Sequence, residues 1–415
     1  METYIARQPI FGRRRRVFGY ELFFRSGLEN VFSHGDPVQA TSKVMVDSFV
    51  LFNIFTLTGG KKAFINTPRD ILLSDFIFLF PKELIVVEIL ETVDPDSAVI
   101  AALKKLKKAG YLLAIDDFVY SEKTAPFLEF ADFVKVDFLK TPPEERKSFP
   151  KKIQSKKTKL VAEKVETPEM YREGMESGYH YFQGYFFSKP NILAGKDIPG
   201  YKTHYLQVLQ EVHRPGMDFE KLEEYIKREV SIAYKLLRYI NSAFFNFPHK
   251  INSIKQALTL LGEKRVKNWI SLVALANMGK DKPEELAVWS IVRAKFCESL
   301  GPSFLLGSRA DDLFLMGLFS FIDAFLDRPL ADILQEIPIE GAIKDALLGE
   351  KNPLLDVYLY TLDYEKGSWE GITEQQSKFA IEEYLPLRLY LEAVQWGQRC
   401  FPEEASEGNP KSRKS

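Results

Sequence analysis

The chain contains few cysteines and has almost no excess of either charge, and each of these features excludes a class of protein. Cys297 and Cys400 are the only cysteines among 415 residues, which gives neither a disulfide framework nor a metal-ligand spacing and suits a reducing compartment. The 56 basic and 57 acidic residues nearly cancel. The chain therefore has no overall electrostatic field that would attract nucleic acid or an anionic membrane.

Segments that would direct the chain to a membrane are also missing from the sequence. Residues 1–4 contain neither the basic region nor the apolar core of a signal peptide. The most apolar long stretch, residues 44–57, is interrupted by Asp47, Ser48 and Asn53, so we expect a buried helix there and no membrane span. These patterns predict a cytoplasmic protein.

Up to residue 195, short apolar runs alternate with amphipathic stretches. The strand candidates are Tyr20–Phe24, Ala63–Asn66, Leu84–Glu88, Leu112–Asp116, Phe133–Val136, Leu160–Glu163 and Tyr181–Gln183. Between them lie helical patterns such as 96–108 and 168–177, followed by Gly110 and Gly178 where helix C-caps are expected. Repeated β–α alternation predicts a TIM-like β/α barrel. Residues 4–24 predict an antiparallel hairpin at its start.

Eight polar residues come one after another at the predicted strand ends: Glu21, Asn66, Glu88, Asp116, Asp117, Lys135, Glu163 and Gln183. In a parallel β/α barrel the C-terminal strand ends face one shared cup, where active sites are built. Carboxylate and amide oxygens are the ligands of hard divalent cations, and two such cations can clamp a phosphodiester. Taken alone, Asp116–Asp117 is typical of a helix cap or turn. The metal-site interpretation depends on the whole ordered set.

The composition shifts between residues 190 and 200, where Pro190, Gly195, Pro199 and Gly200 interrupt the periodicity. Beyond this point apolar residues recur at helical spacing, in 219–229, 231–240, 254–261, 264–278, 284–300 and 311–325. We predict a barrel over residues 1–195, a linker at 196–200, an all-α domain over 201–398 and a disordered tail over 399–415.

The barrel half carries motifs that resemble those of EAL domains, whose members hydrolyse the bacterial second messenger cyclic di-GMP. Glu21-Leu22-Phe23 stands where the family has its signature Glu-Ala-Leu. The full set, in the family's order, is Val17–Arg25, Phe64–Asn66, Val87–Glu91, Ile115–Phe118, Val134–Asp137, Ala162–Thr167 and Gln183–Tyr185. The resemblance covers residues 1–195.

This resemblance implies a role for each polar residue of the set. One Mg²⁺ or Mn²⁺ would be held by Glu21, Asn66, Glu88 and Asp116, and Asp117 would join Asp116 at a second ion. Glu163 would be the general base for the attacking water, which Lys135 would orient. Arg25 would contact a phosphate of the dinucleotide. The residues implied to support the site are Gln183, at the substrate, and Glu91 and Glu166, around the metal ligands.

The sequence departs from the family mainly after Phe118. Active members continue with Gly-Thr-Gly-Tyr-Ser-Ser, whereas residues 119–124 are Val-Tyr-Ser-Glu-Lys-Thr. Since glycine alone enters left-handed conformations freely, we expect this loop to follow a different path. Leu22-Phe23 also adds bulk beside Glu21, and the segment from Arg25 to Lys62 matches poorly. These changes around the ligands predict weak or absent hydrolysis.

Residues 201–398 resemble an HDOD domain, a helical relative of HD-type phosphohydrolases, on the motifs at 230–244, 251–262 and 317–323. Ser320-Phe321 stands where an active HD enzyme has its His-Asp pair, and no histidine follows His249. We expect no metal and no catalysis in this domain, which leaves packing or partner binding as its role.

Three functions therefore stay open. The first is a signalling protein of the EAL–HDOD type that binds cyclic di-GMP with weak or no hydrolysis and acts on a protein partner through the HDOD domain. The alternative is an active metal-dependent cyclic di-GMP phosphodiesterase that gives the linear dinucleotide. A pure interaction scaffold is a third reading, and a homodimer is compatible with all three. No nucleic-acid or membrane partner is expected, since the basic run at 13–16 is typical of a solvated turn.

Two smaller patterns have ordinary structural interpretations. The Phe76–Phe80 cluster is expected to be buried core more than an interface. Asn241-Ser242 is expected to be a helix-capping turn.

Overall fold

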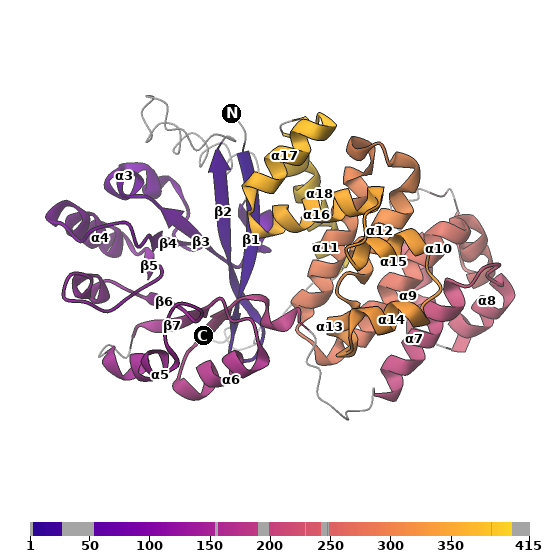
Figure 1. The fold of residues 1–415 in the computed structure, drawn as a ribbon, viewed down its shortest axis with the longest axis horizontal. Helices are drawn as coiled ribbons and strands as arrows, with labels where there is room; N and C mark the ends of the chain where they lie inside the picture. Colours follow the sequence, from indigo (N-terminus) through magenta and orange to yellow (C-terminus); the bar gives the residue numbers. More distant parts are fainter. Residues whose placement is uncertain are drawn as a thin grey trace, which may run out of the picture.

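The computed structural model describes residues 3–26, 54–153, 157–189, 199–228, 230–241, 247, 249–382 and 384–400. Within these residues a closed barrel is followed by an all-helical region, which confirms the predicted fold class (Figure 1). The stretch at 44–57 up to Asn53, the linker at 196–198 and the tail from residue 401 lie outside the described residues. The predicted domain boundaries therefore stay predictions.

The first strand closes the barrel and runs antiparallel to both of its neighbours. Its strands, in spatial and chain order, are β1 (Thr3–Gly12), β2 (Val17–Ser26), β3 (Lys62–Thr67), β4 (Ile85–Ile89), β5 (Leu112–Ile115), β6 (Phe133–Asp137), β7 (Lys159–Glu163) and β8 (Tyr181–Gln183). β1 pairs antiparallel with both β2 and β8, and the other pairs are parallel. The predicted hairpin is thus confirmed, and its exposed turn is fixed by Arg13, which donates to the carbonyl of Tyr179 at 2.7 Å.

Helical segments cover the barrel and return the chain from strand to strand. They are α2 (Ile54–Thr58), α3 (Arg69–Leu73), η1 (Asp75–Leu79), α4 (Ser97–Ala109), η2 (Ala125–Glu129), α5 (Pro143–Lys152), α6 (Pro168–Ser177) and η3 (Tyr185–Phe187). α4 begins where the Asp96 carboxylate accepts from the Val99 amide, and it ends at Gly110 with φ 93°. α6 ends in the same way at Gly178, so both predicted C-caps are confirmed.

The aromatic cluster at 76–80 is largely core, as predicted. Phe80 is buried, Phe76 packs edge-on against it, and Phe78 packs against Tyr111. Leu79 is the exposed member of this segment.

The second half is built from helices that pack on one another. The long helices are α7 (Gly200–Val212), α8 (Phe219–Arg228), α9 (Val230–Ile240), α10 (Ile254–Met278), α11 (Glu284–Leu300), α12 (Ala310–Phe319), α16 (Pro353–Lys366), α17 (Trp369–Phe379) and α18 (Leu385–Cys400). The short ones are η4 (Gly279–Asp281), η5 (Gly301–Phe304), η6 (Gly307–Arg309), α13 (Ile322–Leu326), α14 (Leu330–Glu336) and α15 (Gly341–Leu347). None of the helices in the described part of the chain has the length and apolarity needed to cross a bilayer.

Two helix boundaries differ from the sequence expectation. The pattern at 311–325 predicted one helix, but α12 and α13 are separate, with Ser320 and Phe321 between them. The patterns at 254–261 and 264–278 are joined in α10 across a kink at Gly262, whose φ is 72°.

Asn241 does cap α9, because its amide donates to the Leu237 and Ile251 carbonyls. Ser242 lies outside the described residues.

The two halves share one apolar core, and the last helix returns to the first strand. Buried residues of the barrel exterior and of the helical region form a single cluster. α18 contacts both β1 and α2. Tyr390 of α18 helps raise the pKa of Arg7 on β1, and the Gln398 side chain donates to the Thr56 carbonyl at 2.7 Å. Figure 1 shows α16 and α18 beside β1.

Candidate metal centre and active site

Inside the barrel, every strand except β2 pairs an apolar floor residue with a polar residue two positions away. Because side chains alternate along a strand, residues two apart face the same side. The pairs are Ile10 with Gln8, Phe64 with Asn66, Val86 with Glu88, Ala114 with Asp116, Phe133 with Lys135, Val161 with Glu163, and Tyr181 with Gln183. The apolar members pack as a separate core inside the barrel. The polar members lie above this floor, and with Glu21 of β2 they form what we call the cup.

Strand register brings the members of the cup side by side. Asn66 on β3 lies opposite Glu88 on β4. Gln8 lies opposite Glu21, and Ile10 lies opposite Gln183. Because β1 runs antiparallel, its polar residue precedes its floor residue, which is why Gln8 enters the cup. Sequence reasoning missed Gln8, and the only signal for it is the reversed order of this pair.

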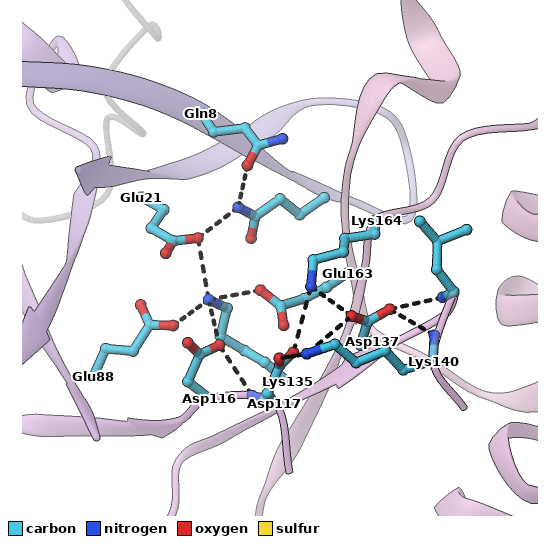
Figure 2. A network of polar contacts seen from close by, with 12 residues as sticks. Gln8, Glu21, Glu88, Asp116, Asp117, Lys135, Asp137, Lys140, Glu163 and Lys164 are labelled. Atoms are coloured by element: carbon cyan, nitrogen blue, oxygen red, sulfur yellow. Dashed lines mark hydrogen bonds and ion pairs between the residues drawn. The ribbon is translucent and has the colours of Figure 1, made fainter. Parts of the chain in front are cut away.

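The Lys135 ammonium lies at the centre of the cup (Figure 2). Its side chain is fully buried. Its Nζ is 2.6 Å from Glu163 Oε1, 3.1 Å from Glu21 Oε2 and 3.1 Å from Asp116 Oδ1, and it also contacts Glu88 Oε1. Four carboxylates from four strands therefore surround one cation.

Amide side chains hold Glu21 from the other side. Asn66 Nδ2 donates to Glu21 Oε1 at 3.0 Å, and Gln183 Nε2 donates to Glu21 Oε2 at 2.6 Å. Gln183 Nε2 also donates to the side-chain oxygen of Gln8, Oε1, at 2.8 Å, so that Gln8, Gln183 and Glu21 form one chain of hydrogen bonds. This chain fixes which oxygens of Glu21 face the centre.

The charges of the cup shift the pKa values of its groups. Burial raises the pKa of Glu163 to about 8, with help from Asp116 and Glu21, although Lys135 opposes the shift. Burial and the charge of Glu21 hold the pKa of Glu88 well above its ordinary value. Burial disfavours the Lys135 charge, but the surrounding carboxylates outweigh it and hold the Lys135 pKa well above its ordinary value. The cup therefore holds more carboxylate groups than the single ammonium group of Lys135 can neutralise.

The Asp117 carboxylate pairs with two lysines other than Lys135. Its carboxylate is 2.6 Å from Lys140 Nζ and 3.8 Å from Lys164 Nζ. Lys164 also donates to Asp137 at 2.5 Å, and Asp137 accepts from the amides of Leu139 and Lys140. Asp117 and Lys164 both have left-handed backbone, with φ 40° and 53°, a conformation that costs free energy in residues other than glycine. No role for Lys140 was predicted from the sequence, since its position follows from tertiary structure.

The remaining predicted residues lie outside this network. Glu91 is exposed, and Glu166 accepts a hydrogen bond from Lys189 at 2.8 Å. Arg25 belongs to β2, but its side chain is outside the described part of the structure.

The altered loop after Phe118 does not pull the carboxylates out of the cup. Residues 119–124 form a tight turn in which Thr124 Oγ1 donates to the Val119 carbonyl at 2.7 Å and accepts from the Ser121 amide. Val119 and Tyr120 at its tip are exposed. Asp116 keeps its contact with Lys135.

The donor set of the cup fits a hard divalent cation. Among the described residues, Glu21, Glu88 and Glu163 can bring ligand oxygens within 4.8 Å of one another, and so can Asp116, Asp117 and Glu163. Asn66 Oδ1 and Glu88 Oε2 are buried without a hydrogen-bond partner in the structure. Buried oxygens are normally satisfied, and a cation that accepts oxygen ligands would satisfy these two.

Comparison with known proteins gives two domain matches and two relatives that cover nearly the whole chain. The EAL domain family matches residues 52–190, and the HDOD domain family matches residues 198–327. The chain is 35% identical over 404 residues to the uncharacterized protein YuxH of Bacillus subtilis, which covers 95% of this chain and 98% of that protein. It is 32% identical over 399 residues to the cyclic di-GMP phosphodiesterase CdgJ of Vibrio cholerae, which covers 95% of this chain and 92% of CdgJ.

The chain belongs to the EAL–HDOD family. Among solved structures, its EAL barrel overlaps the manganese and cyclic di-GMP complex of Klebsiella pneumoniae BlrP1. That match has 23% identity and a TM-score of 0.39, and it covers 45% of this chain and 55% of that one.

The HDOD domain has an ordinary buried contact where an HD enzyme would have its histidine and aspartate. Ser320 Oγ donates to the Gly317 carbonyl at 2.6 Å and accepts from Arg293 at 2.9 Å. Arg293 is paired in turn with Glu365 and lies over the Phe321 ring. The expectation of a metal-free HDOD domain remains a prediction.

A buried histidine of the HDOD domain predicts that the protein loses folding stability at acidic pH. His213 is buried, lies 2.8 Å from Ser271 Oγ, and burial lowers its pKa from 6.5 to about 3. Below about pH 6.5 the unfolded chain binds a proton that the folded protein excludes, so stability falls as the pH falls. At pH 5 this linkage removes about 2 kcal/mol.

We expect His213→Gln to flatten the pH dependence of urea unfolding between pH 7 and pH 5. His249→Gln, a change at an exposed histidine, should leave it as in the wild type. Equal slopes in all three proteins would contradict the assignment of a neutral His213.

Proposed function

We propose that the EAL barrel is a metal-dependent phosphodiesterase that opens cyclic di-GMP to the linear dinucleotide. One observation carries the proposal: four carboxylates from four strands converge on Lys135 Nζ, while buried oxygens of Asn66 and Glu88 lack partners. Homology to CdgJ over nearly the whole chain supports the choice of substrate.

The metal ligands proposed are Glu21, Asn66, Glu88 and Asp116 for one Mg²⁺ or Mn²⁺, with Asp117 and Asp116 at a second. Such ions, when bound, lower the pKa of a shared water and stabilise the charge of a phosphodiester under attack. The protein supplies the rest. Amides of Asn66 and Gln183 orient Glu21, and outer partners of this kind strongly influence metal affinity.

Glu163 and Lys135 are proposed to handle the proton and the charge. Glu163 is buried beside Lys135 Nζ and would accept the proton of the attacking water. Lys135 would hold that water through its ammonium hydrogens and offset negative charge on the phosphate. Arg25 is proposed to contact the phosphate from the end of β2, with Gln183 beside the substrate.

A second candidate function is a receptor that binds cyclic di-GMP without cleaving it. The specific observation in its favour is that Lys140 and Lys164 already neutralise Asp117. A second divalent ion would have to displace these ammonium groups. In either case, we propose that the HDOD domain passes the state of the barrel to a protein partner.

The test is incubation of the purified full-length protein with cyclic di-GMP and Mn²⁺ or Mg²⁺, with the linear product followed by chromatography. We expect turnover by the wild type and none by Asp116→Asn. Bound Mn²⁺, measured by elemental analysis after desalting, should be lost in the same variant. Binding of cyclic di-GMP without turnover would favour the receptor, and stoichiometric Mn²⁺ in Asp116→Asn would remove the Asp116 carboxylate from the essential ligands.

A further inference from the structure

One helix of the HDOD domain, α11, packs against the barrel at β2, which carries Glu21, and at the η3 segment that follows β8. Glu285 and Trp289 lie four residues apart on this helix and so share one face. Both are buried, and both contact barrel residues. Neither residue has been given a role in the proposed reaction.

Glu285 makes a buried polar contact with β1 and β2. The Tyr20 hydroxyl donates to Glu285 Oε2 at 2.9 Å, and Arg7 NH2 lies 3.9 Å from Glu285 Oε1. The Arg7 guanidinium stacks over the Tyr20 ring at 4.5 Å and donates to the Leu57 carbonyl at 2.6 Å. A carboxylate of the HDOD domain thus accepts a hydrogen bond from a tyrosine and faces the charge of an arginine on the outside of the barrel.

These two barrel residues are the direct chain neighbours of two members of the cup. Side chains alternate along a strand, so Arg7 and Tyr20 point outward where Gln8 and Glu21 point inward. Gln8 and Glu21 are opposite each other in the β1–β2 register and are joined through Gln183. If β1 or β2 rotated or shifted where it contacts Glu285, the carboxylate of Glu21 would therefore move.

Trp289 packs against the segment that follows β8. Its ring packs against Phe187 at 5.1 Å and Tyr185 at 5.9 Å, in the η3 segment that follows β8. Only Gly184 separates Tyr185 from Gln183. A Cβ at Gly184 would lie 2.3 Å from the Val165 carbonyl oxygen, and its φ is 139°. This close backbone contact leaves little freedom between the Trp289 contact and the Gln183 side chain.

We propose that Glu285 of the HDOD domain is a positioning residue for the EAL metal centre, acting through Arg7 and Tyr20 on Glu21. The proposal rests on the function proposed above. Full metal affinity would then require α11 to be docked on the barrel. A partner that shifts α11 would change the metal affinity of the cup.

The test compares Mn²⁺ affinity in full-length variants, by electron paramagnetic resonance of free Mn²⁺ well below the melting temperature. Glu285→Gln keeps the size of the side chain and removes the charge that faces Arg7. We expect its Mn²⁺ dissociation constant to rise at least about tenfold, the scale seen when residues that orient metal ligands are changed. Tyr20→Phe, which removes one hydroxyl, should give a smaller change in the same direction.

Gln398→Ala is the matched control, because it removes a hydrogen bond across the same domain boundary, to the Thr56 carbonyl of α2, and leaves the contacts of Glu285 and Tyr20 in place. A purely structural role for Glu285 would lower thermal stability without changing Mn²⁺ affinity in the folded protein. Unchanged affinity in both Glu285→Gln and Tyr20→Phe would overturn the inference while the metal site stands. Failure of the wild type to bind Mn²⁺, or unchanged binding in Glu88→Gln, would overturn the proposed function together with the inference.

Discussion

Lys135→Met is expected to lower the free energy of unfolding by about 3–5 kcal/mol in the absence of divalent cations, because it leaves buried carboxylates without their cation. Lys135 is fully buried, and Glu21, Glu88, Asp116 and Glu163 all contact its ammonium group. Methionine preserves much of the apolar stem, so packing loss contributes little. Urea unfolding in the presence of a chelator measures the effect.

Mn²⁺ should restore part of the lost stability, since a divalent cation can take the place of the missing charge among these oxygens. Any ligand that binds only the folded form stabilises it in this way. Lys140→Met is the matched control, because Lys140 is exposed and pairs with Asp117 at the rim. We expect little change from it. Equal losses in the two variants would show that Lys135 is not the counter-ion of the cup.

Glu163→Gln is expected to reduce turnover of cyclic di-GMP by about 10²–10⁴-fold, the usual contribution of a positioned general base. The amide keeps the shape of the side chain and its contact with Lys135 but cannot take the proton of the attacking water. Mn²⁺ binding should persist, because Glu21, Asn66, Glu88 and Asp116 are unchanged. The measurement is the rate of linear product formation at saturating metal.

Glu169→Gln, an exposed change on α6, serves as the control for a lost charge and should keep the wild-type rate. If Glu163→Gln lost metal together with turnover, Glu163 would be a ligand. If it kept full activity, another group would be the base. If the wild type itself binds cyclic di-GMP without turnover, the receptor proposal would replace the enzyme.

The barrel and the order of its polar residues could be predicted because both depend on short-range patterns. A floor residue and a polar residue two positions apart, such as Phe133 and Lys135, can be recognised within one strand. The cap at Gly110 likewise depends only on neighbouring residues. The break between α12 and α13 was missed, because the apolar run around Ser320 continues through it and is buried on all sides.

Other features of the site could not be predicted because they depend on contacts between distant segments. Lys140 and Lys164 reach Asp117 only once two strand ends have been placed beside each other. The effect of the changed loop at 119–124 on the rate stays a prediction, although Asp116 keeps its place. Glu285 is more than two hundred residues from Tyr20, and nothing in the local sequence marks it as a partner.

The return of α18 to β1 has a consequence for the order of folding during synthesis. β1 and α2 are synthesised long before α18, which contacts both of them. Domains usually fold as units from the N-terminus during translation, but here contacts of very long sequence separation complete the first one. The nascent barrel must therefore leave the α18 side of β1 uncovered until α18 has been made.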